Sequence, residues 1–481
     1  MKISEYFNLN KSQYELDFVD IDTTQDIPLF LDPYFLSIRN DNWSINATRS
    51  LRSFFSHFLT LIRNGLEDQA HELFSHLHEP NETCLGLSKG RPSGRGIGIQ
   101  DADDIFESIL RSRVATTGVL EHLEDTRLFV EGVGKDKISD MATNIIRKNL
   151  IEYTQKQCGL WNIPLTKNVP TGDMWDPVNR RWTNEYDDML IIEGKKILLV
   201  PKVVVSYTDR YTPDQYTQHF VLNFLQNEHL RMNSALVQTK KLKDGTEKKY
   251  VTKTSIKESI RIDKEFLKNF TENHPEVFKE FKEKLPEYTR IISQEEFCNI
   301  NKSMLVDYLI KKLQSISTGA QTASEYHRTV TGILELIFYP HLVVPVIENE
   351  IHDGRKRIDI TFNNAAETGF FFRLSNTYGI PSQFIHIECK NYSKDVANPE
   401  LDQLSGRFSP NRGQFGLMLC RTVNNLDTFL DRCADTYSDG RGLIIPLVDD
   451  DLISLLNKVK DEREDLIDEF LMQRYRRIGL V

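Results

Sequence analysis

The most regular alternation of apolar and polar residues lies in the last third of the chain. Short β-branched and aromatic runs there predict strands, and apolar residues repeating every three to four positions predict helices between them. We predict strands over Leu342–Ile351, Arg355–Phe362, Gln383–Ser393, Phe415–Arg421 and Gly442–Val448. We predict helices over Ser324–Phe338, Pro399–Phe408, Leu426–Asp435 and Leu452–Lys458.

This order of elements indicates a mixed α/β domain with three layers. His352, Asp353 and Gly354 form a turn signal that joins the first two strands as a hairpin. The later strands are almost continuously apolar and alternate with helices, which is typical of parallel strands covered on both faces. The predicted fold class is therefore α/β, with a mixed central sheet between helical layers and a larger mixed α/β region before it.

The first half of the chain has weaker patterns. Arg49–Ile62 has helical spacing, and Lys196–Tyr207, KILLVPKVVVSY, is predicted to be the strongest strand of this half. Ser88–Gly98 contains glycines and arginines that could contact a phosphate. However, it matches neither GxGxxG after a strand nor the Walker loop, so a flexible or partner-contacting loop is favoured. Gln238–Tyr288 is rich in lysine, and we expect solvated faces there in preference to phosphate contacts.

Three domains follow from these changes in pattern, because a chain of 481 residues exceeds one ordinary core. Residues 1–237 form a predicted mixed α/β domain without a recognisable activity. Residues 238–314 are predicted to be a charged helical connector, and residues 315–481 form the patterned C-terminal domain.

Composition narrows the class of protein. Hydrophobic residues make up 40% of the chain and charged residues 27%, which is typical of a globular protein. No apolar run is long enough to span a bilayer and the first residues lack a signal core, so we expect a cytoplasmic protein without a membrane partner. The six cysteines have no zinc-ligand spacing and are expected to be reduced. The net charge of −10 excludes a uniformly basic surface but allows a local basic groove.

The candidate chemistry lies on two neighbouring predicted strands. Because side chains alternate between the faces of a strand, Glu388 and Lys390 share one face, and Asp359 lies on the strand before them. Burying such charges is costly unless they are paired or bound to a metal. A site is therefore favoured over the structural alternative, a cross-strand ion pair between Lys390 and one of the carboxylates.

These residue types suit metal-dependent hydrolysis of a phosphodiester. Asp359 and Glu388 could share Mg²⁺, or Mn²⁺, with the main-chain carbonyl of Cys389 as a third ligand. Such a metal acts as a Lewis acid and lowers the pKa of bound water. Lys390 would then orient or help to deprotonate the attacking water and offset the charge of the phosphate.

The order of elements and the motif Asp359…Glu388-Cys389-Lys390 resemble the PD-(D/E)XK nuclease superfamily, which has the restriction-endonuclease-like fold. The resemblance covers about residues 315–460, and Ile358 replaces the proline of the PD element. Val200-Pro201-Lys202 is a faint second copy of the motif. We expect coincidence there in preference to a degenerate nuclease-like core in the N-terminal domain.

The resemblance implies further site residues. A helix glutamate often completes the site; Glu325 matches the family's position slightly better, although helical periodicity does not separate it from Glu335. Gln403 resembles a glutamine that faces the site in several families, and Arg407 shares its helix face. The residues predicted to contact nucleic acid are Arg355, Arg357, Asn391 and Arg407.

We therefore expect a Mg²⁺-dependent endonuclease acting on double-stranded DNA, working as a homodimer or with an activating partner protein. The resemblance alone implies a role in prokaryotic restriction or anti-phage defence. The alternatives are a non-catalytic nucleic-acid-binding or scaffold protein that retains the fold, and a nuclease specific for RNA or single strands.

Overall fold

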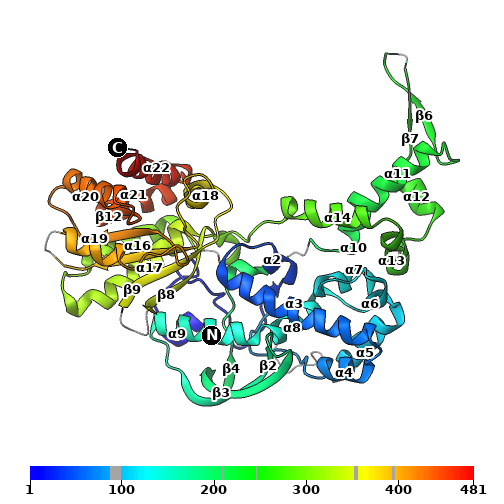
Figure 1. Cartoon of the computed structure of the whole chain (residues 1–481), viewed down its shortest axis with the longest axis horizontal. Helices are drawn as coiled ribbons and strands as arrows, with labels where there is room; N and C mark the ends of the chain where they lie inside the picture. The colour runs from blue at the N-terminus through cyan, green and yellow to red at the C-terminus, as the bar shows by residue number, and fades with distance from the viewer. Residues whose placement is uncertain are drawn as a thin grey trace.

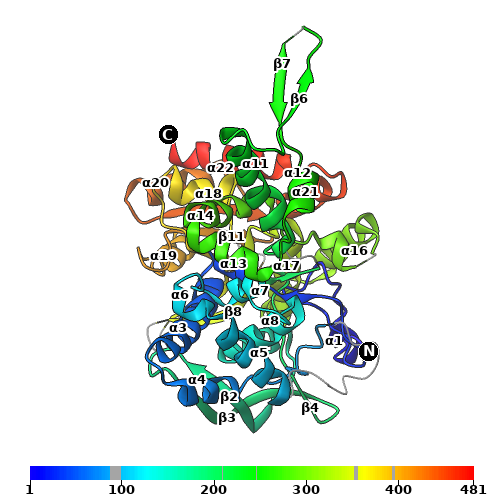
Figure 2. The same cartoon turned by 90° about the vertical axis from the view of Figure 1, so that its right-hand side faces the viewer.

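A computed structural model describes residues 1–86, 99–207, 210–244, 246–298, 300–351, 356–392 and 396–480; the side chains of 99–101, 288, 348–351 and 356–358 lie outside this description. The predicted loop Ser88–Gly98 therefore lies outside the described residues. Figures 1 and 2 show an N-terminal lobe, a C-terminal lobe and an arm that projects from them.

The C-terminal lobe is built on a mixed sheet of five strands, which confirms the predicted fold class. The strands are β8 (Leu342–Ile351), β9 (Lys356–Asn364), β10 (Phe384–Lys390), β11 (Phe415–Cys420) and β12 (Leu443–Val448). Their order is β12-β11-β10-β9-β8. β8, β9 and β10 pair antiparallel, whereas β10, β11 and β12 pair parallel. Every residue of β11 is buried, which requires cover on both faces of the sheet.

Two groups of helices provide this cover. α16 (Lys302–Ser315), α17 (Ala323–Phe338) and α21 (Asp449–Lys460) pack with one another and against the sheet. The second group consists of α18 (Gly369–Asn376), α19 (Asn398–Ser405), α20 (Leu426–Ser438) and α22 (Asp465–Gly479). Leu305, Leu309 and Leu313 of α16 belong to this C-terminal core. By packing, the C-terminal lobe therefore begins earlier than residue 315.

The N-terminal lobe is mostly helical and has a separate core. Its longest helix is α3 (Asn42–Arg63), whose buried stripe includes Phe54, Phe55 and Phe58. The other helices are α1 (Ile3–Tyr6), α2 (Pro33–Ser37), α4 (Glu67–Phe74), α5 (Ile99–Ser112), α6 (Val114–Thr117), α7 (Thr126–Phe129), α8 (Lys135–Ile145) and α9 (Arg147–Trp161). β2 (Thr166–Asp176), β3 (Arg181–Ile192) and β4 (Lys195–Ile197) form an antiparallel sheet, and β1 (Phe30–Leu31) pairs with β5 (Val205–Ser206).

The prediction of one long strand over Lys196–Tyr207 is wrong. Only β4 and β5 are strands there, and Lys202–Val204 form a short 3-10 helix between them. The segment is apolar because it is buried, as Leu198 and Val204 have no exposed surface. Within the described residues the N-terminal lobe has no parallel strand pair and no second mixed sheet, so Lys202 does not belong to a degenerate nuclease-like core.

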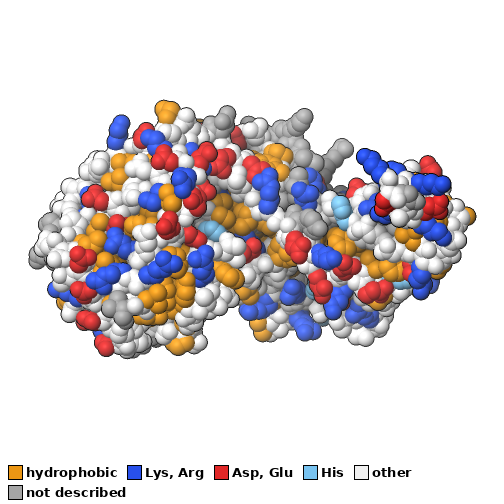
Figure 3. All heavy atoms as spheres, turned by 90° about the horizontal axis from the view of Figure 1, so that it is seen from above, with side chains coloured by type: hydrophobic (Ala, Val, Ile, Leu, Met, Phe, Trp, Pro, Cys, Tyr) orange, Lys and Arg blue, Asp and Glu red, His pale blue; other side chains and the backbone are white. Residues whose placement is uncertain are grey.

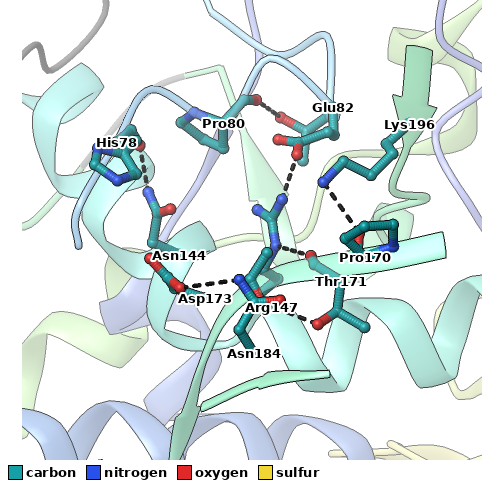
Figure 4. Close-up of polar contacts among 12 residues, drawn as sticks. His78, Pro80, Glu82, Asn144, Arg147, Pro170, Thr171, Asp173, Asn184 and Lys196 are labelled. Carbon is teal, nitrogen blue, oxygen red and sulfur yellow. Dashed lines mark hydrogen bonds and ion pairs between the residues drawn. The ribbon is translucent and has the colours of Figure 1, made fainter. Parts of the chain in front are cut away.

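A cluster of hydrogen bonds and ion pairs joins the β2–β3 ribbon to the helices (Figure 4). Arg147 Nε donates a hydrogen bond to the carbonyl oxygen of Thr171 at 2.8 Å, and its Nη2 pairs with Glu82. Gly172 has φ of +78°, and a Cβ there would lie 3.1 Å from the Arg147 guanidinium. Lys196 Nζ donates to the carbonyl oxygen of Pro170 at 3.2 Å. These contacts give Arg147 a structural role.

The arm consists of helices and an exposed hairpin. β6 (Gln238–Lys241) and β7 (Glu247–Tyr250) form the hairpin, which projects away from both lobes in Figure 1. The surrounding helices are α10 (Pro213–Tyr216), α11 (Leu222–Arg231), α12 (Lys253–Ser259), α13 (Lys264–Asn273), α14 (Pro275–Lys284) and α15 (Gln294–Phe297). Phe270, Phe278 and Phe281 join the N-terminal core, so part of the predicted connector packs on that lobe.

The two lobes are in direct contact. Gln157 Nε2 of α9 donates to the carbonyl oxygen of Pro345 in β8 at 3.1 Å, and Val343 and Val344 join the N-terminal core. Val344 has φ of +53° at an irregularity in the β8–β9 ladder, and its N–H donates to Asp17 Oδ1 at 2.9 Å. No helix in the described part of the chain has the length and apolar character needed to cross a membrane.

Candidate active site

The candidate site lies where β9 and β10 separate. Their register ends at the pair Ile387 and Ile360, so Cys389 has no backbone partner on β9. Instead, the Cys389 N–H donates to Asp359 Oδ2 at 2.8 Å. N–H and C=O of one strand residue point to the same edge, which directs the Cys389 carbonyl towards Asp359 as well. The end of the ladder thus leaves the Asp359 carboxylate beside the backbone of Cys389.

Glu388 is the centre of the polar contacts. Lys390 Nζ donates to Glu388 Oε1 at 2.6 Å and to Gln403 Oε1 at 3.0 Å. Arg407 Nη1 donates to the other oxygen, Glu388 Oε2. Glu388 and Arg407 are buried, while Lys390 is half-buried and Gln403 is exposed. Lys390 Nζ therefore joins Glu388 of the same strand face to Gln403 of α19.

Burial sets the electrostatics of this cluster. It raises the pKa of Glu388, and the nearby carboxylate of Asp359 raises that pKa further, whereas Lys390 and Arg407 lower it. Burial likewise raises the pKa of the Cys389 thiol well above its ordinary value, so the thiol is not a nucleophile here. Two carboxylates that repel each other in a partly dry site favour a cation between them.

The donor set fits a hard divalent cation. Asp359, Glu388 and the Cys389 carbonyl are oxygen ligands of the kind that Mg²⁺ prefers, with water completing the coordination. Within the described ranges no group of three or more His, Cys, Asp or Glu side chains is arranged to hold a metal. Metal binding would therefore rest on two carboxylates, and one oxygen of Glu388 would have to leave Arg407 or Lys390.

Neither predicted helix glutamate contacts these carboxylates. Glu325 is exposed at the start of α17 and pairs with Lys312 of α16. Glu335 is buried near the end of α17, where its Oε2 lies 3.6 Å from Lys202 Nζ in the interface with the N-terminal lobe. The prediction chose Glu325, although helical periodicity did not separate it from Glu335. The structure gives Glu335 a different partner and leaves Glu325 on the surface of the lobe.

Asn391 does not face a nucleic-acid groove. Its Nδ2 donates to the carbonyl oxygens of Ser317 and Gly319 at 3.3 and 3.0 Å, and its Oδ1 accepts from Arg421 Nη1 at 3.0 Å. These contacts occupy the buried side chain, so Asn391 holds the loop before α17 instead of contacting a phosphate. Arg355 lies outside the described residues, as does the side chain of Arg357 in β9.

Sequence reasoning missed a second polar group at the same edge of the sheet. Arg421, just after β11, pairs with Asp449 Oδ2 at 2.7 Å and lies over the ring of Tyr326, whose hydroxyl donates to Asp449 at 3.0 Å. The sequence could have predicted this pair, because Arg421 and Asp449 directly follow two parallel strands whose carboxyl ends meet at one edge of the sheet.

The fold and this cluster define a mixed α/β protein with a charged site at one edge of its C-terminal sheet. Residues 8–212 match the family model described as Domain of unknown function (DUF8370). The match ends before the arm and does not reach Asp359 or Glu388. Comparison with curated proteins and with solved structures gave no match to the chain.

Proposed function

We propose that the C-terminal lobe is a Mg²⁺-dependent nuclease that hydrolyses phosphodiester bonds in DNA. The observation that carries this proposal is the contact of Glu388 and Lys390 on β10 beside Asp359 on β9, at the point where the strands separate. This arrangement resembles the PD-(D/E)XK nucleases, and that resemblance alone suggests restriction or anti-phage defence. Cleavage of both strands would require a homodimer or repeated action.

In this proposed reaction the side chains near Asp359 and Glu388 would have different roles. A bound Mg²⁺ would supply Lewis acidity and lower the pKa of a coordinated water. Gln403 holds Lys390 Nζ at 3.0 Å, which keeps this cation beside Glu388. Lys390 can then donate to the attacking water or to a phosphate oxygen. Arg407, once released from Glu388, can hold a non-bridging phosphate oxygen through its planar donors.

The arm supports nucleic acid as the substrate. Lys240 and Lys248 face each other across the hairpin, and like charges in this position destabilise the pair. Neither side chain has an ion pair or hydrogen bond within the described part of the chain. Figure 3 views the molecule from above and shows Lys and Arg side chains, mixed with Asp and Glu, at the end that carries the arm. A phosphate backbone would relieve this repulsion.

One observation favours a second candidate, a non-catalytic nucleic-acid-binding protein. Both oxygens of Glu388 are held by cationic side chains, Lys390 and Arg407, which is also how a structural ion-pair network would look. Because the two proposals share the fold and the partner, only the chemistry distinguishes them.

The test is cleavage by the purified full-length protein. Supercoiled plasmid, linear duplex, single strands and RNA would be incubated with Mg²⁺, with Mn²⁺ or with EDTA. We expect cleavage only with metal, and a loss of about 100-fold or more in Asp359→Ala and Lys390→Ala. Asp402→Ala is the matched control, because Asp402 adjoins Gln403 on α19 but pairs with Arg441 at 2.7 Å. Equal activity in all variants would refute the site, and binding without cleavage of any substrate would support the non-catalytic candidate.

A further inference from the structure

The N-terminal lobe has an arginine-lined pocket that the proposed nuclease activity does not use. It has a volume of about 550 Å³ and lies between the end of α2, the first half of α3 and the turn between β2 and β3. Its charged lining residues are Arg39, Arg49, Arg52 and Arg180, and no carboxylate lines it. Side-chain hydroxyls of serine and threonine make up much of the rest. The pocket lies within the residues that match the family model.

Most of the positive charge in this pocket is uncompensated. Arg39 Nε donates to Asp41 Oδ2 at 3.1 Å, which neutralises one guanidinium. Arg49 Nη1 donates only to the neutral amide oxygen of Asn46, at 3.0 Å. Arg52 and Arg180 are exposed and have no side-chain partner among the described residues. Three unpaired guanidinium groups in a chain of net charge −10 form a local field that attracts anions.

The pocket also contains hydrogen-bond donors without acceptors. Arg39 Nη2 and Thr48 Oγ1 are buried, and neither has a partner in the described part of the chain. A buried donor without an acceptor destabilises the protein by the full free energy of its lost hydration, and this cost is largest for a charged group. Because both residues line the pocket, an oxygen-rich ligand, or water held beneath it, would satisfy them.

The backbone that carries Arg180 is held in place before any ligand binds. Arg180 ends the β2–β3 turn with φ of +53°, and this turn is closed by Asp176, whose Oδ1 accepts from the N–H of Val178 at 2.9 Å. Ser53 Oγ of α3 donates to the carbonyl oxygen of Pro177 at 2.9 Å, which ties the turn to the helix. The turn that carries Arg180 is thus fixed beside α3, and less ordering of the backbone is needed on binding.

We propose that this pocket binds a ligand that carries several phosphate groups and is about the size of a nucleotide. Guanidinium groups match phosphate oxygens with paired planar donors, and three unpaired ones suit more than one negative charge. The volume lies in the usual range for small-molecule sites, about 300–1,000 Å³. A free nucleotide and a nucleic-acid backbone share this chemistry. Binding in this pocket does not depend on catalysis by the C-terminal lobe.

The test is isothermal titration of the full-length protein in EDTA, which prevents binding through a metal. The probes are inorganic tripolyphosphate, ATP and a short DNA duplex. We expect tripolyphosphate and ATP to bind, and Arg52→Gln/Arg180→Gln to weaken binding about 10-fold or more. Arg111→Gln/Arg261→Gln removes the same charge from exposed positions elsewhere, with side chains 79% and 90% exposed, and should bind like the wild type.

The outcomes separate the sources of phosphate. Binding of the duplex alone, lost in Arg52→Gln/Arg180→Gln, would assign the pocket to a nucleic-acid backbone. Thr48→Val provides an uncharged check, because it removes a buried hydroxyl that has no partner among the described residues, and it should also weaken binding. No binding of any probe by the wild type, or equal weakening in both double variants, would overturn the proposal.

Discussion

Replacing Lys202 by methionine tests how the two lobes are held together. Lys202 has no exposed surface, and its Nζ lies 3.6 Å from Glu335 Oε2 of α17 and 4.4 Å from the centre of the Tyr339 ring. Its backbone N–H donates to the carbonyl oxygen of Asp17, whose side chain holds the N–H of Val344 in β8. Lys202→Met keeps most of the volume but leaves the carboxylates of Asp17 and Glu335 without a nearby cation.

The expected loss follows from this geometry. At 3.6 Å and an effective dielectric constant of about 20, the attraction between Lys202 and Glu335 is at most about 4–5 kcal/mol, reached at a pH where both groups are charged. Breaking a buried pair by removing one partner costs about 3–5 kcal/mol in other proteins, and we expect a loss in this range at pH 8. Burial, with the charge of Asp17, raises the pKa of Glu335, and Lys202 lowers it. In the variant Glu335 will therefore stay protonated to a higher pH.

The sign of the pH dependence follows. A carboxyl whose pKa is raised on folding contributes stability below its ordinary pKa and loses it as the pH rises. Lys202→Met raises the pKa of Glu335 further, so its destabilisation should be larger at pH 8 than at pH 6. Differential scanning fluorimetry and urea unfolding at both values would measure this difference.

Two further variants make the result decisive. Lys312→Met breaks the exposed pair with Glu325 at the other end of α17 and should cost no more than about 1 kcal/mol. Lys202→Met/Glu335→Gln removes both charges and should regain at least half of the loss. If Lys202→Met unfolds within about 1 kcal/mol of the wild type at pH 8, or if the double variant is no more stable than the single one, the reasoning fails.

Three other variants have defined outcomes. Burial and neighbouring carboxylates raise the pKa of Asp140 to about 8, so wild-type stability falls as the pH rises towards that value. Asp140→Asn should therefore raise the melting temperature more at pH 9 than at pH 5, and an equal gain at both values would contradict this. Lys240→Gln/Lys248→Gln should make the plot of log binding constant against log salt concentration less steep, by the equivalent of about two phosphate contacts. An unchanged slope would exclude the hairpin from the interface with the duplex. Arg407→Gln frees one oxygen of Glu388, so Mn²⁺ binding, measured by electron paramagnetic resonance, should become tighter while kcat/KM for cleavage falls. Weaker Mn²⁺ binding would show that the Arg407–Glu388 pair does not compete with the metal.

Local patterns predicted the C-terminal lobe well because its elements are regular. All five strands and the helix α17 form where the apolar spacing placed them. Alternation along β10 placed Glu388 beside Lys390, whereas Gln403 was chosen from the family resemblance; its Oε1 accepts from Lys390 Nζ. The run Lys196–Tyr207 failed because an apolar, β-branched sequence reports burial and does not show whether a neighbouring strand is available for pairing.

By itself, the sequence determined which side chains share a strand or a helix face, and hence the contact of Glu388 with Lys390. Only the tertiary structure decided what those side chains meet. The Arg407 pair with Glu388, the capture of Asn391 by the loop before α17 and the burial of Glu335 against Lys202 all join distant segments. The arginine pocket likewise joins α3 to a turn more than a hundred residues away in the chain. The physical reason is that periodicity depends on the backbone of one element, whereas charge pairing and desolvation depend on the packing of several.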